Sequence, residues 1–346
     1  MIRKDLDSLP AYVPGARMEN ALKLSSNEMS QAPLDSAVEA MTKAAAGVNR
    51  YPDMGATELK EKLAAHLGVD AAQVAVGTGS SALCMQLVVA TSQPGDEVVY
   101  PWRSFEAYPI FVKISGATGV PVPLKDERLD LPAIAAAVTD KTKLIFICNP
   151  NNPTGTTITT EEFSQFMEQV PADVIVALDE AYFEYNTNGD TPIATEAMRR
   201  YPNVIGLRTF SKAYGLAGIR VGYAFGAEDI IAGINKVAVP FSVSSVAQAA
   251  AIASLEATAE FKTRIDESIE QRTKMNEHFS DFGSPESFAN FVWLPAEKLP
   301  EEPLALAGRL AEEGVLVRAF PEGVRITTTT AEETERLLSA WDKVVK

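Results

Sequence analysis

The sequence predicts an α/β fold in which a mostly parallel β-sheet is covered by helices. Residues 144–148 and 174–178 are apolar without interruption, and helical segments separate such runs along much of the chain. Strands that lack a polar face are typical of a sheet buried between two layers of helices. The chain has 346 residues, which is more than one core usually holds, so we expect two domains.

The predicted large domain covers residues 31–245. Helices are expected over 34–46 and 56–67, over 105–114 and over 160–169. One more apolar helix is expected to follow the loop 77–81 and to end near residue 91. Strands are expected at short apolar runs, over 74–76, 97–100, 144–148, 174–179, 204–208 and 221–225. The alternation of the two kinds of element indicates a doubly wound sheet.

The two ends of the chain are expected to form a smaller α+β domain. Residues 1–30 are rich in turn formers and are predicted to pack on the small domain and the active site. The C-terminal domain is predicted over 246–346. It would begin with one long helix, because residues 247–279 contain neither glycine nor proline. Short strands are expected near 291–294, 315–318 and 324–327.

Composition argues against several classes of partner. The net charge of −15 disfavours nucleic acid and anionic membranes, which need a basic face. No membrane span and no signal peptide are expected. Cys84 and Cys148 lie in apolar runs and are expected to be reduced thiols of a cytoplasmic protein. His66 and His278 stand alone, so we expect no metal site.

Residues 209–222, with the sequence TFSKAYGLAGIRVG, follow a run that predicts a buried strand. Lys212 could form a Schiff base with an aldehyde once its amine is deprotonated. Thr209, Ser211 and Arg220 could bind an anion beside it, since an arginine contacts two oxygens at once. An aldehyde and a phosphate on one small molecule describe pyridoxal 5′-phosphate. The alternative is a surface lysine after a strand. The presence of the lysine, the hydroxyl groups and the arginine together, at this spacing, disfavours that alternative.

Two other positions fit the same ligand. Gly79, Ser80 and Ser81 lie between a strand and a helix, where backbone N–H groups and the helix dipole favour a phosphate. This loop lacks the third glycine of a dinucleotide-binding fingerprint and is a weak signal alone. Asp179 ends a predicted strand, where a carboxylate could keep a pyridine nitrogen protonated. A helix-capping aspartate would fit the same position.

The segment 209–222 resembles the cofactor-lysine motif of the class I/II, fold type I, aminotransferases. It is most similar to histidinol-phosphate aminotransferases and to their relatives that act on aromatic amino acids, and the resemblance extends from the N-terminal segment to Arg325. It implies a fold type I enzyme in which Lys212 holds pyridoxal 5′-phosphate as an aldimine. It also assigns the glycine–serine loop to the cofactor phosphate.

The resemblance implies further cofactor contacts. Asn152, in the Asn-Pro-Thr-Gly motif, would donate a hydrogen bond to the phenolic oxygen of the cofactor. Tyr182, three residues after Asp179, could reach the same oxygen. Phe105 is expected to stack on the pyridine ring, where close relatives often have a tyrosine. Lys212, Asp179 and Tyr182 are the expected catalytic residues.

Other matches concern the substrate and the assembly. Arg325 matches the arginine that binds the substrate α-carboxylate through two hydrogen bonds. Tyr12 and Asn27 are expected to close over the site, and Arg318 could bind a distal group of the substrate. Tyr51 resembles a residue that reaches the partner's cofactor phosphate in a homodimer, although a tyrosine at a turn would fit as well.

The function that the resemblance favours is aromatic amino acid transamination. Phenylalanine, tyrosine or tryptophan would give its amino group to a 2-oxo acid, with 2-oxoglutarate expected, and Tyr12, Trp102, Phe105 and Phe241 could surround the ring. The alternative is a histidinol-phosphate aminotransferase of histidine biosynthesis, with the distal phosphate on Arg318. A decarboxylase would share the cofactor site, whereas the effector domain of a transcription regulator would need a basic module that the sequence lacks.

Overall fold

The computed structural model describes residues 7, 9 and 18–345. Its strands are β1 (Leu22–Lys23), β2 (Val74–Gly77), β3 (Glu97–Trp102), β4 (Thr118–Pro123), β5 (Thr142–Cys148), β6 (Ile175–Asp179), β7 (Val204–Thr209), β8 (Gly222–Phe225), β9 (Phe291–Pro295), β10 (Val315–Leu316), β11 (Arg318–Phe320) and β12 (Gly323–Thr327). Its α-helices are α1 (Asp35–Ala45), α2 (Thr57–Leu67), α3 (Ser80–Thr91), α4 (Tyr108–Ser115), α5 (Leu131–Ala136), α6 (Thr160–Met167), α7 (Ala194–Arg200), α8 (Glu228–Val237), α9 (Ser245–Glu256), α10 (Thr258–His278), α11 (Pro303–Glu312) and α12 (Ala331–Val345).

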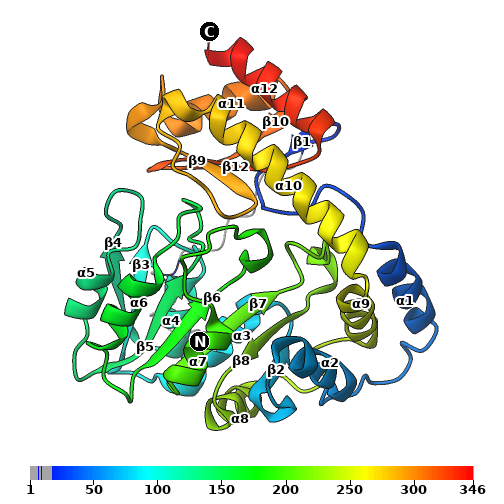
Figure 1. Cartoon of the computed structure of the whole chain (residues 1–346), viewed down its shortest axis with the longest axis vertical. Coiled ribbons are helices and arrows are strands. Elements are labelled where there is room, and N and C mark those ends of the chain that lie inside the picture. The colour runs from blue at the N-terminus through cyan, green and yellow to red at the C-terminus, as the bar shows by residue number, and fades with distance from the viewer. Residues whose placement is uncertain (1–6, 8, 10–17, 346) are drawn as a thin grey trace.

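A seven-stranded sheet forms the centre of the larger part of the molecule (Figure 1), with the strand order β2-β8-β7-β6-β5-β3-β4. Strand β8 is antiparallel to both of its neighbours, and the remaining pairs are parallel. The predicted mostly parallel sheet is therefore confirmed. In such a sheet the carboxyl ends of β5, β6 and β7 lie side by side at one edge.

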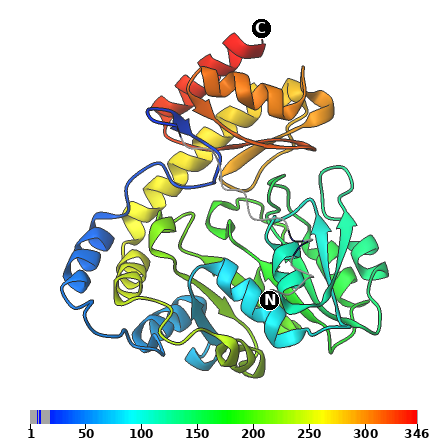
Figure 2. The same ribbon diagram turned by 180° about the vertical axis from the view of Figure 1, so that it is seen from behind.

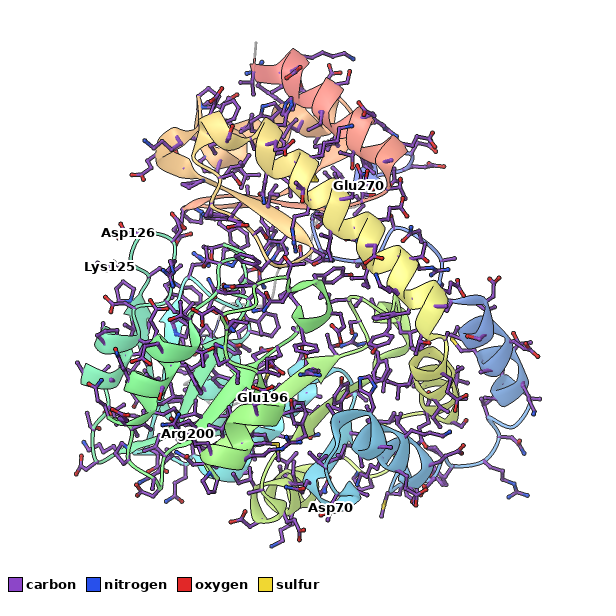
Figure 3. The ribbon with its side chains drawn as sticks, in the orientation of Figure 1. Asp70, Lys125, Asp126, Glu196, Arg200 and Glu270 are labelled. Carbon is purple, nitrogen blue, oxygen red and sulfur yellow. The ribbon has the colours of Figure 1, made fainter. Side chains whose placement is uncertain are left out.

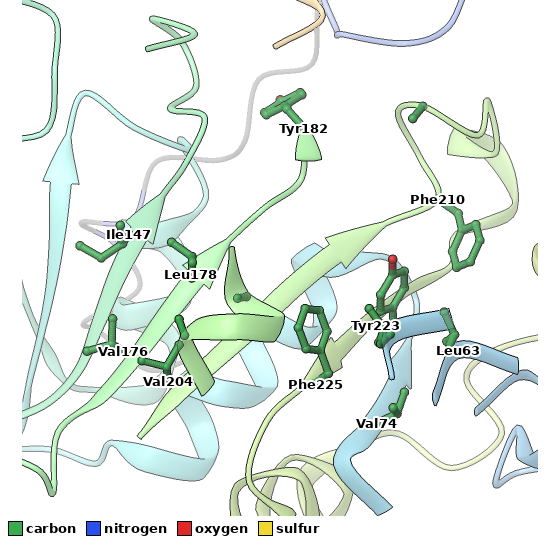
Figure 4. Packing of buried hydrophobic residues seen from close by; sticks show 14 of the residues in the cluster. Leu63, Val74, Ile147, Val176, Leu178, Tyr182, Val204, Phe210, Tyr223 and Phe225 are labelled. Atoms are coloured by element: carbon green, nitrogen blue, oxygen red, sulfur yellow. The ribbon is translucent and has the colours of Figure 1, made fainter. Parts of the chain in front are cut away.

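Strand β5 shows why this sheet needs a layer of helices on each face. Ile145 and Ile147 belong to one buried cluster, whereas Leu144, Phe146 and Cys148 belong to another, because successive side chains of a strand point to opposite faces. Side chains of α2, α5, α6, α7 and α9 contribute to the first cluster, part of which Figure 4 shows. Side chains of α3, α4 and α8 contribute to the second.

Segments from both ends of the chain build the smaller part of the molecule (Figure 2). Strands β9, β12 and β11 form an antiparallel sheet in the order β11-β12-β9. Strand β1 pairs in parallel with β10, which places Leu22 opposite Val315. Leu22 and Leu24 share a buried core with Trp341 of α12. The pairing holds the segment that follows β1 close to strand β12.

The segment 247–279 is helical, as predicted, but it is not one continuous helix. The structure has two helices, α9 and α10, which meet at Ala257 with φ −83° and ψ 48°. Packing explains the break: α9 lies against α1 and α2, whereas α10 lies against α12 and β9. No glycine or proline marks this position, so the sequence carries no local signal for it. The domain boundary near residue 245 stays a prediction, with α9 on the side of the large sheet.

The outer surface of the helices and loops carries exposed charged side chains, including the six labelled in Figure 3. Within residues 18–345 the structure has no helix that is both long and apolar enough to cross a membrane. Cys84 and Cys148 are buried and free, as expected.

Candidate active site

A cavity of about 560 Å³ opens where β5, β6 and β7 end, and strand β12 contributes to its wall. Ligands of open α/β sheets bind at this position, beyond the carboxyl ends of the strands. Most of the predicted site residues line the cavity, namely Asn27, Ser80, Ser81, Phe105, Asn152, Asp179, Tyr182, Thr209, Ser211, Lys212, Arg220, Arg318 and Arg325. The structure thus brings together residues that are up to 298 positions apart in the sequence, from Asn27 to Arg325.

Among the described residues, two of the predicted ones, Gly79 and Tyr51, do not line the cavity. Gly79 adjoins it, immediately before Ser80 at the start of α3. Tyr12 lies outside the residues that the structure describes. Tyr51 is 82% exposed and stacks on Phe241, with ring centroids 4.7 Å apart.

The expected aromatic wall needs a correction. Phe241 lies in the exposed stack with Tyr51, so it does not line the cavity of its own chain. Trp102 packs under the guanidinium of Arg103, 4.4 Å from the ring centroid, and is not part of the lining either. Instead, the apolar wall consists of Phe105, Ala107, Ile110 and Phe111. Ala107 precedes α4, and Ile110 and Phe111 lie in its first turn, where apolar residues gave no sign of facing a ligand.

One end of the cavity gathers groups whose chemistry suits an anion. Gly79 has φ +82° and precedes the first turn of α3, where Ser80 and Ser81 line the cavity at a helix N-terminus, a position that favours an anion. A Cβ atom on Gly79 would lie 2.5 Å from Nη2 of Arg220, so the close approach of this guanidinium requires glycine. Arg220 donates to Oγ of Ser211 at 3.2 Å and to the carbonyl of Ala217 at 2.8 Å. The arrangement concentrates positive charge and hydroxyl groups at one point.

Lys212 lies next to this anion site and is largely removed from water. Its Nζ donates to the backbone carbonyl of Ser26 at 3.0 Å. Burial lowers the pKa of the Lys212 amine to about 7, and the nearby charges of Arg325 and Arg220 act in the same direction. A neutral amine is therefore available near neutral pH, which nucleophilic attack on a carbonyl requires.

Asp179 is buried at the end of β6, on the face of the sheet that α4 covers. The hydroxyl of Tyr108 donates to Oδ2 of Asp179 at 2.6 Å, and the backbone N–H of Ala181 donates to Oδ1 at 3.3 Å. Burial raises the pKa of Asp179 to about 6, although these hydrogen bonds oppose the rise. A buried carboxylate of this kind gains from a cationic partner, such as a protonated ring nitrogen.

Arg325 enters the cavity from the opposite side, on β12. Its Nη1 donates to Oδ1 of Asn152, and its Nη2 donates to the carbonyl of Ser25 at 2.8 Å. Because the amide oxygen of Asn152 faces Arg325, its NH₂ group is directed elsewhere and can serve as a donor to a ligand.

Asn27 connects the N-terminal segment to the same network. Its backbone has φ 54°, a left-handed conformation that asparagine tolerates better than most residues. Its Nδ2 donates to the hydroxyl of Tyr182 at 2.9 Å, and its Oδ1 accepts from Oγ1 of Thr327 at 3.1 Å. The residues that follow β1 are thereby held against the cavity by strand β12.

The cavity's donors and acceptors fit pyridoxal 5′-phosphate. The serine hydroxyls, Arg220 and the N-terminus of α3 suit a phosphate, and the amine of Lys212 suits an aldehyde. Asp179 suits a pyridinium nitrogen, and Asn152 and Tyr182 offer donors for a phenolic oxygen. All of these groups line one cavity, and a Cβ atom on the neighbouring Gly79 would collide with the guanidinium of Arg220.

Sequence reasoning missed Tyr108, Glu106 and the carbonyl groups of Ser25 and Ser26. Tyr108 and Glu106 are neighbours of Phe105, which was identified, but their partners are fixed by tertiary packing. Backbone carbonyl groups carry no signal in a sequence. The spacing of three residues between Phe105 and Tyr108 at the start of a helix was the available hint, since it favours a shared face.

Comparisons with known proteins give the family. The family model described as aminotransferase class I and II matches residues 19–340. An enzyme named aromatic amino acid aminotransferase from Corynebacterium glutamicum is 61% identical over 345 residues, with 99% of both chains covered. One with the same name from Rhodococcus opacus is 51% identical, with 97% of this chain and 94% of that protein covered.

A solved structure has the same fold. The histidinol-phosphate aminotransferase from Sinorhizobium meliloti, in complex with pyridoxal-5′-phosphate, superposes with a TM-score of 0.91 at 30% identity, covering 99% of this chain and 97% of that one. The predicted family and fold class are therefore confirmed. The chain belongs to the class I and II aminotransferase family.

Proposed function

We propose that this protein is an aromatic amino acid aminotransferase that uses pyridoxal 5′-phosphate and passes the amino group of phenylalanine, tyrosine or tryptophan to a 2-oxo acid. The observation that carries the proposal is one cavity with three features: the amine of Lys212, the guanidinium of Arg325 and an apolar wall that includes Phe105, Ile110 and Phe111. The names of the full-length relatives support the same substrate class.

The cofactor would be held by residues at both ends of the cavity. Pyridoxal phosphate, when bound, supplies an electron-withdrawing ring that stabilises negative charge at the Cα atom of the amino acid. Arg220 and the hydroxyl groups of Ser80, Ser81 and Ser211 would bind the phosphate. Asp179 would keep the ring nitrogen protonated.

The substrate would be held and deprotonated by two basic residues. Arg325 would bind the α-carboxylate, which fixes the position of Cα in the cavity. Lys212, with its pKa near 7, would take the proton from Cα and hold it for return. Because one lysine serves as nucleophile and as proton carrier, the reaction needs no catalytic histidine. Tyr182 would donate a hydrogen bond beside Asn152, and its own hydroxyl is oriented by Asn27.

The test is a comparison of kcat/KM for phenylalanine, tyrosine, histidinol phosphate and alanine at one 2-oxoglutarate concentration. Burying a ring in an apolar site is worth roughly 1.5–3 kcal/mol. We therefore expect phenylalanine and tyrosine to exceed alanine by about ten- to a hundredfold. Equal values for alanine and phenylalanine would contradict the aromatic wall, and a lead of histidinol phosphate would replace the proposed substrate.

Histidinol-phosphate transamination is the second candidate, because Arg318 lines the cavity and could bind a distal phosphate. The solved enzyme from Sinorhizobium meliloti bears that name. The pairing of Arg318 with Glu106 weighs against this candidate, since the guanidinium already has a carboxylate partner.

The working unit would be a homodimer in the cytoplasm. Large apolar side chains are exposed around Tyr51, among them Val48 at 61%, Met54 at 63% and Val239 at 68%. A group of exposed apolar side chains of this kind is typical of a protein–protein contact. Tyr51 would reach the cofactor phosphate of the partner subunit. The free, buried thiols support a reducing compartment.

A further inference from the structure

Arg318 and Arg325 enter the same cavity from neighbouring strands. Strands β11 and β12 are antiparallel, and Arg318 lies directly opposite Arg325. Side chains at opposed positions point to the same face of a sheet, with Cβ atoms about 5 Å apart. Both residues line the cavity. The β11–β12 hairpin therefore brings a second arginine into the cavity, beside the one assigned to the α-carboxylate.

This second arginine is paired with an acid. Nη2 of Arg318 lies 3.1 Å from Oε1 and 3.0 Å from Oε2 of Glu106. The two side chains are 15% and 27% exposed, and Glu106 also lines the cavity. Arg325 donates to the oxygens of Asn152 and Ser25. The carboxylate of Glu106 thus lies beside the guanidinium of Arg318, at the wall of the cavity.

The cavity next to the Arg318–Glu106 pair is apolar. Phe105, Ile110 and Phe111 line it, and the rings of Phe105 and Phe111 have centroids 6.3 Å apart. A neutral ring gains free energy by burial against such a wall. A distal phosphate, which carries close to two negative charges near neutral pH, would instead meet the like charge of Glu106, which is strongly disfavoured at close range.

We propose that Glu106 is a specificity-determining residue. By pairing with Arg318 it would make the outer cavity accept amino donors with a neutral ring and disfavour donors with a distal phosphate. The inference rests on the proposed aminotransferase function and names the class of donor that this site takes.

A second ion pair between the same two segments provides a matched control. Arg103 donates from Nε at 2.9 Å and from Nη2 at 2.8 Å to the carboxylate of Glu322. Arg103 and Glu106 lie between β3 and α4, and Glu322 and Arg318 lie in the β11–β12 hairpin. Neither Arg103 nor Glu322 lines the cavity. Both pairs hold the hairpin against the large sheet, but one of them faces the substrate.

The first experiment measures the half-reaction of cofactor-loaded enzyme with amino donor alone, followed by absorbance, so the acceptor does not enter. The ratio of apparent second-order rate constants for histidinol phosphate and phenylalanine is compared among variants. We expect this ratio to rise about tenfold or more in Glu106→Gln. It should stay within about twofold of wild type in Glu322→Gln. The ratio should return toward the wild-type value in Glu106→Gln/Arg318→Gln, because the guanidinium that Glu106 no longer neutralises is removed as well.

The second experiment needs no turnover. 3-Phosphonopropionate and 3-phenylpropionate each offer one carboxylate to Arg325, and they differ in a distal phosphonate or a ring. Calorimetric titration of the loaded enzyme should show that Glu106→Gln tightens 3-phosphonopropionate binding, relative to 3-phenylpropionate, by about tenfold or more. Thermal unfolding of each variant identifies any protein that has not folded.

The outcomes separate the inference from the proposed function. An unchanged ratio in Glu106→Gln overturns the role of Glu106. An equal change in Glu322→Gln overturns it as well, because the pair would then act through the position of the hairpin. If phenylalanine fails to react with the wild-type enzyme, the proposed function is wrong, and the titrations with the two analogues still decide the role of Glu106.

Discussion

The hydroxyl of Tyr108 donates a hydrogen bond of 2.6 Å to Oδ2 of Asp179, and both side chains are buried. The ring of Tyr108 stacks on Phe146, with centroids 4.3 Å apart and planes inclined by 13°. Burial raises the pKa of Asp179 to about 6, and the hydrogen bond from Tyr108 opposes that rise. Tyr108 therefore orients the carboxylate and favours its ionised form.

Removing the hydroxyl of Tyr108 should lower the activity at acidic pH and the affinity for the cofactor. In Tyr108→Phe the pKa of Asp179 should rise, because one hydrogen bond to the carboxylate is lost. We expect the acidic limb of the pH–kcat/KM profile to move to higher pH, and the affinity for pyridoxal phosphate to fall about fivefold, the equivalent of one hydrogen bond. Tyr100→Phe removes a hydroxyl from the same aromatic cluster and is the control. Identical profiles for both variants would assign Tyr108 to packing alone.

Asp179 should also determine how the cofactor-free protein responds to pH. Its folded pKa of about 6 lies above the ordinary aspartate value of 3.8, so the folded state binds the proton more tightly than the unfolded state. Stability should therefore fall as pH rises from about 4 to about 6, by roughly 3 kcal/mol for this group. Asp179→Asn lacks this titration. Urea unfolding measures the free energy of unfolding of both proteins at pH 4.5 and 7.5. The difference between the variant and wild type should shift in favour of the variant at pH 7.5. A constant difference would contradict the burial of a charged carboxylate.

Lys212 should react as a neutral amine at unusually low pH. Its lowered pKa of about 7 means that labelling of cofactor-free protein by trinitrobenzenesulfonate should level off above about pH 8 at Lys212. Ordinary lysines, with a pKa near 10.4, should react faster at each step up to about pH 10. Peptide mapping separates the two.

Arg325 provides the control for this labelling, because its charge is the second cause of the shift after burial. Arg325→Gln should raise the midpoint for Lys212, whereas Arg325→Lys, which keeps the charge, should leave it nearly unchanged. A midpoint near 10 in the wild type would mean that Lys212 is exposed in solution.

The elements that the sequence predicted well are those whose signal is local. Strands β5, β6 and β7 are continuous apolar runs, and the polar residues that follow each run mark the edge where ligands bind. Strand β4, Thr118–Pro123, was not predicted, because two prolines and a glycine are typical of a loop. It lies at the edge of the sheet, where proline is tolerated since one side of the strand needs no partner.

The parts of the site that could not be predicted depend on packing between distant segments. Glu106 meets Arg318 across 212 positions of sequence, and Lys212 meets the carbonyl of Ser26 across 186. Motif spacing identifies residues that act on a shared ligand, but it does not identify residues that act on one another. Phe241 illustrates the same limit, since its aromatic character suggested the cavity and the structure places it on the surface beside Tyr51.

The exposed stack of Tyr51 on Phe241 gives a direct test of the proposed dimer. If Tyr51 completes the partner's phosphate site, a subunit with Tyr51→Asp and a subunit with Lys212→Ala are each inactive as homodimers. In a mixed dimer, the site built on the Tyr51→Asp subunit keeps its own Lys212 and receives an intact Tyr51 from the partner. Random mixing of equal amounts should therefore restore about a quarter of the wild-type sites.

The opposite arrangement makes the opposite prediction. If Tyr51 served the cavity of its own chain, each site of a mixed dimer would lack one essential residue, and no activity would return. Mixing Tyr51→Asp with the double variant Tyr51→Asp/Lys212→Ala is the matched control, because no intact Tyr51 is then present. Co-expression with two affinity tags isolates the mixed species, and sedimentation measures its size. Full activity of a monomer would rule out a shared site, because no partner would be present to supply Tyr51. The 82% exposure of Tyr51 would then not reflect a subunit interface.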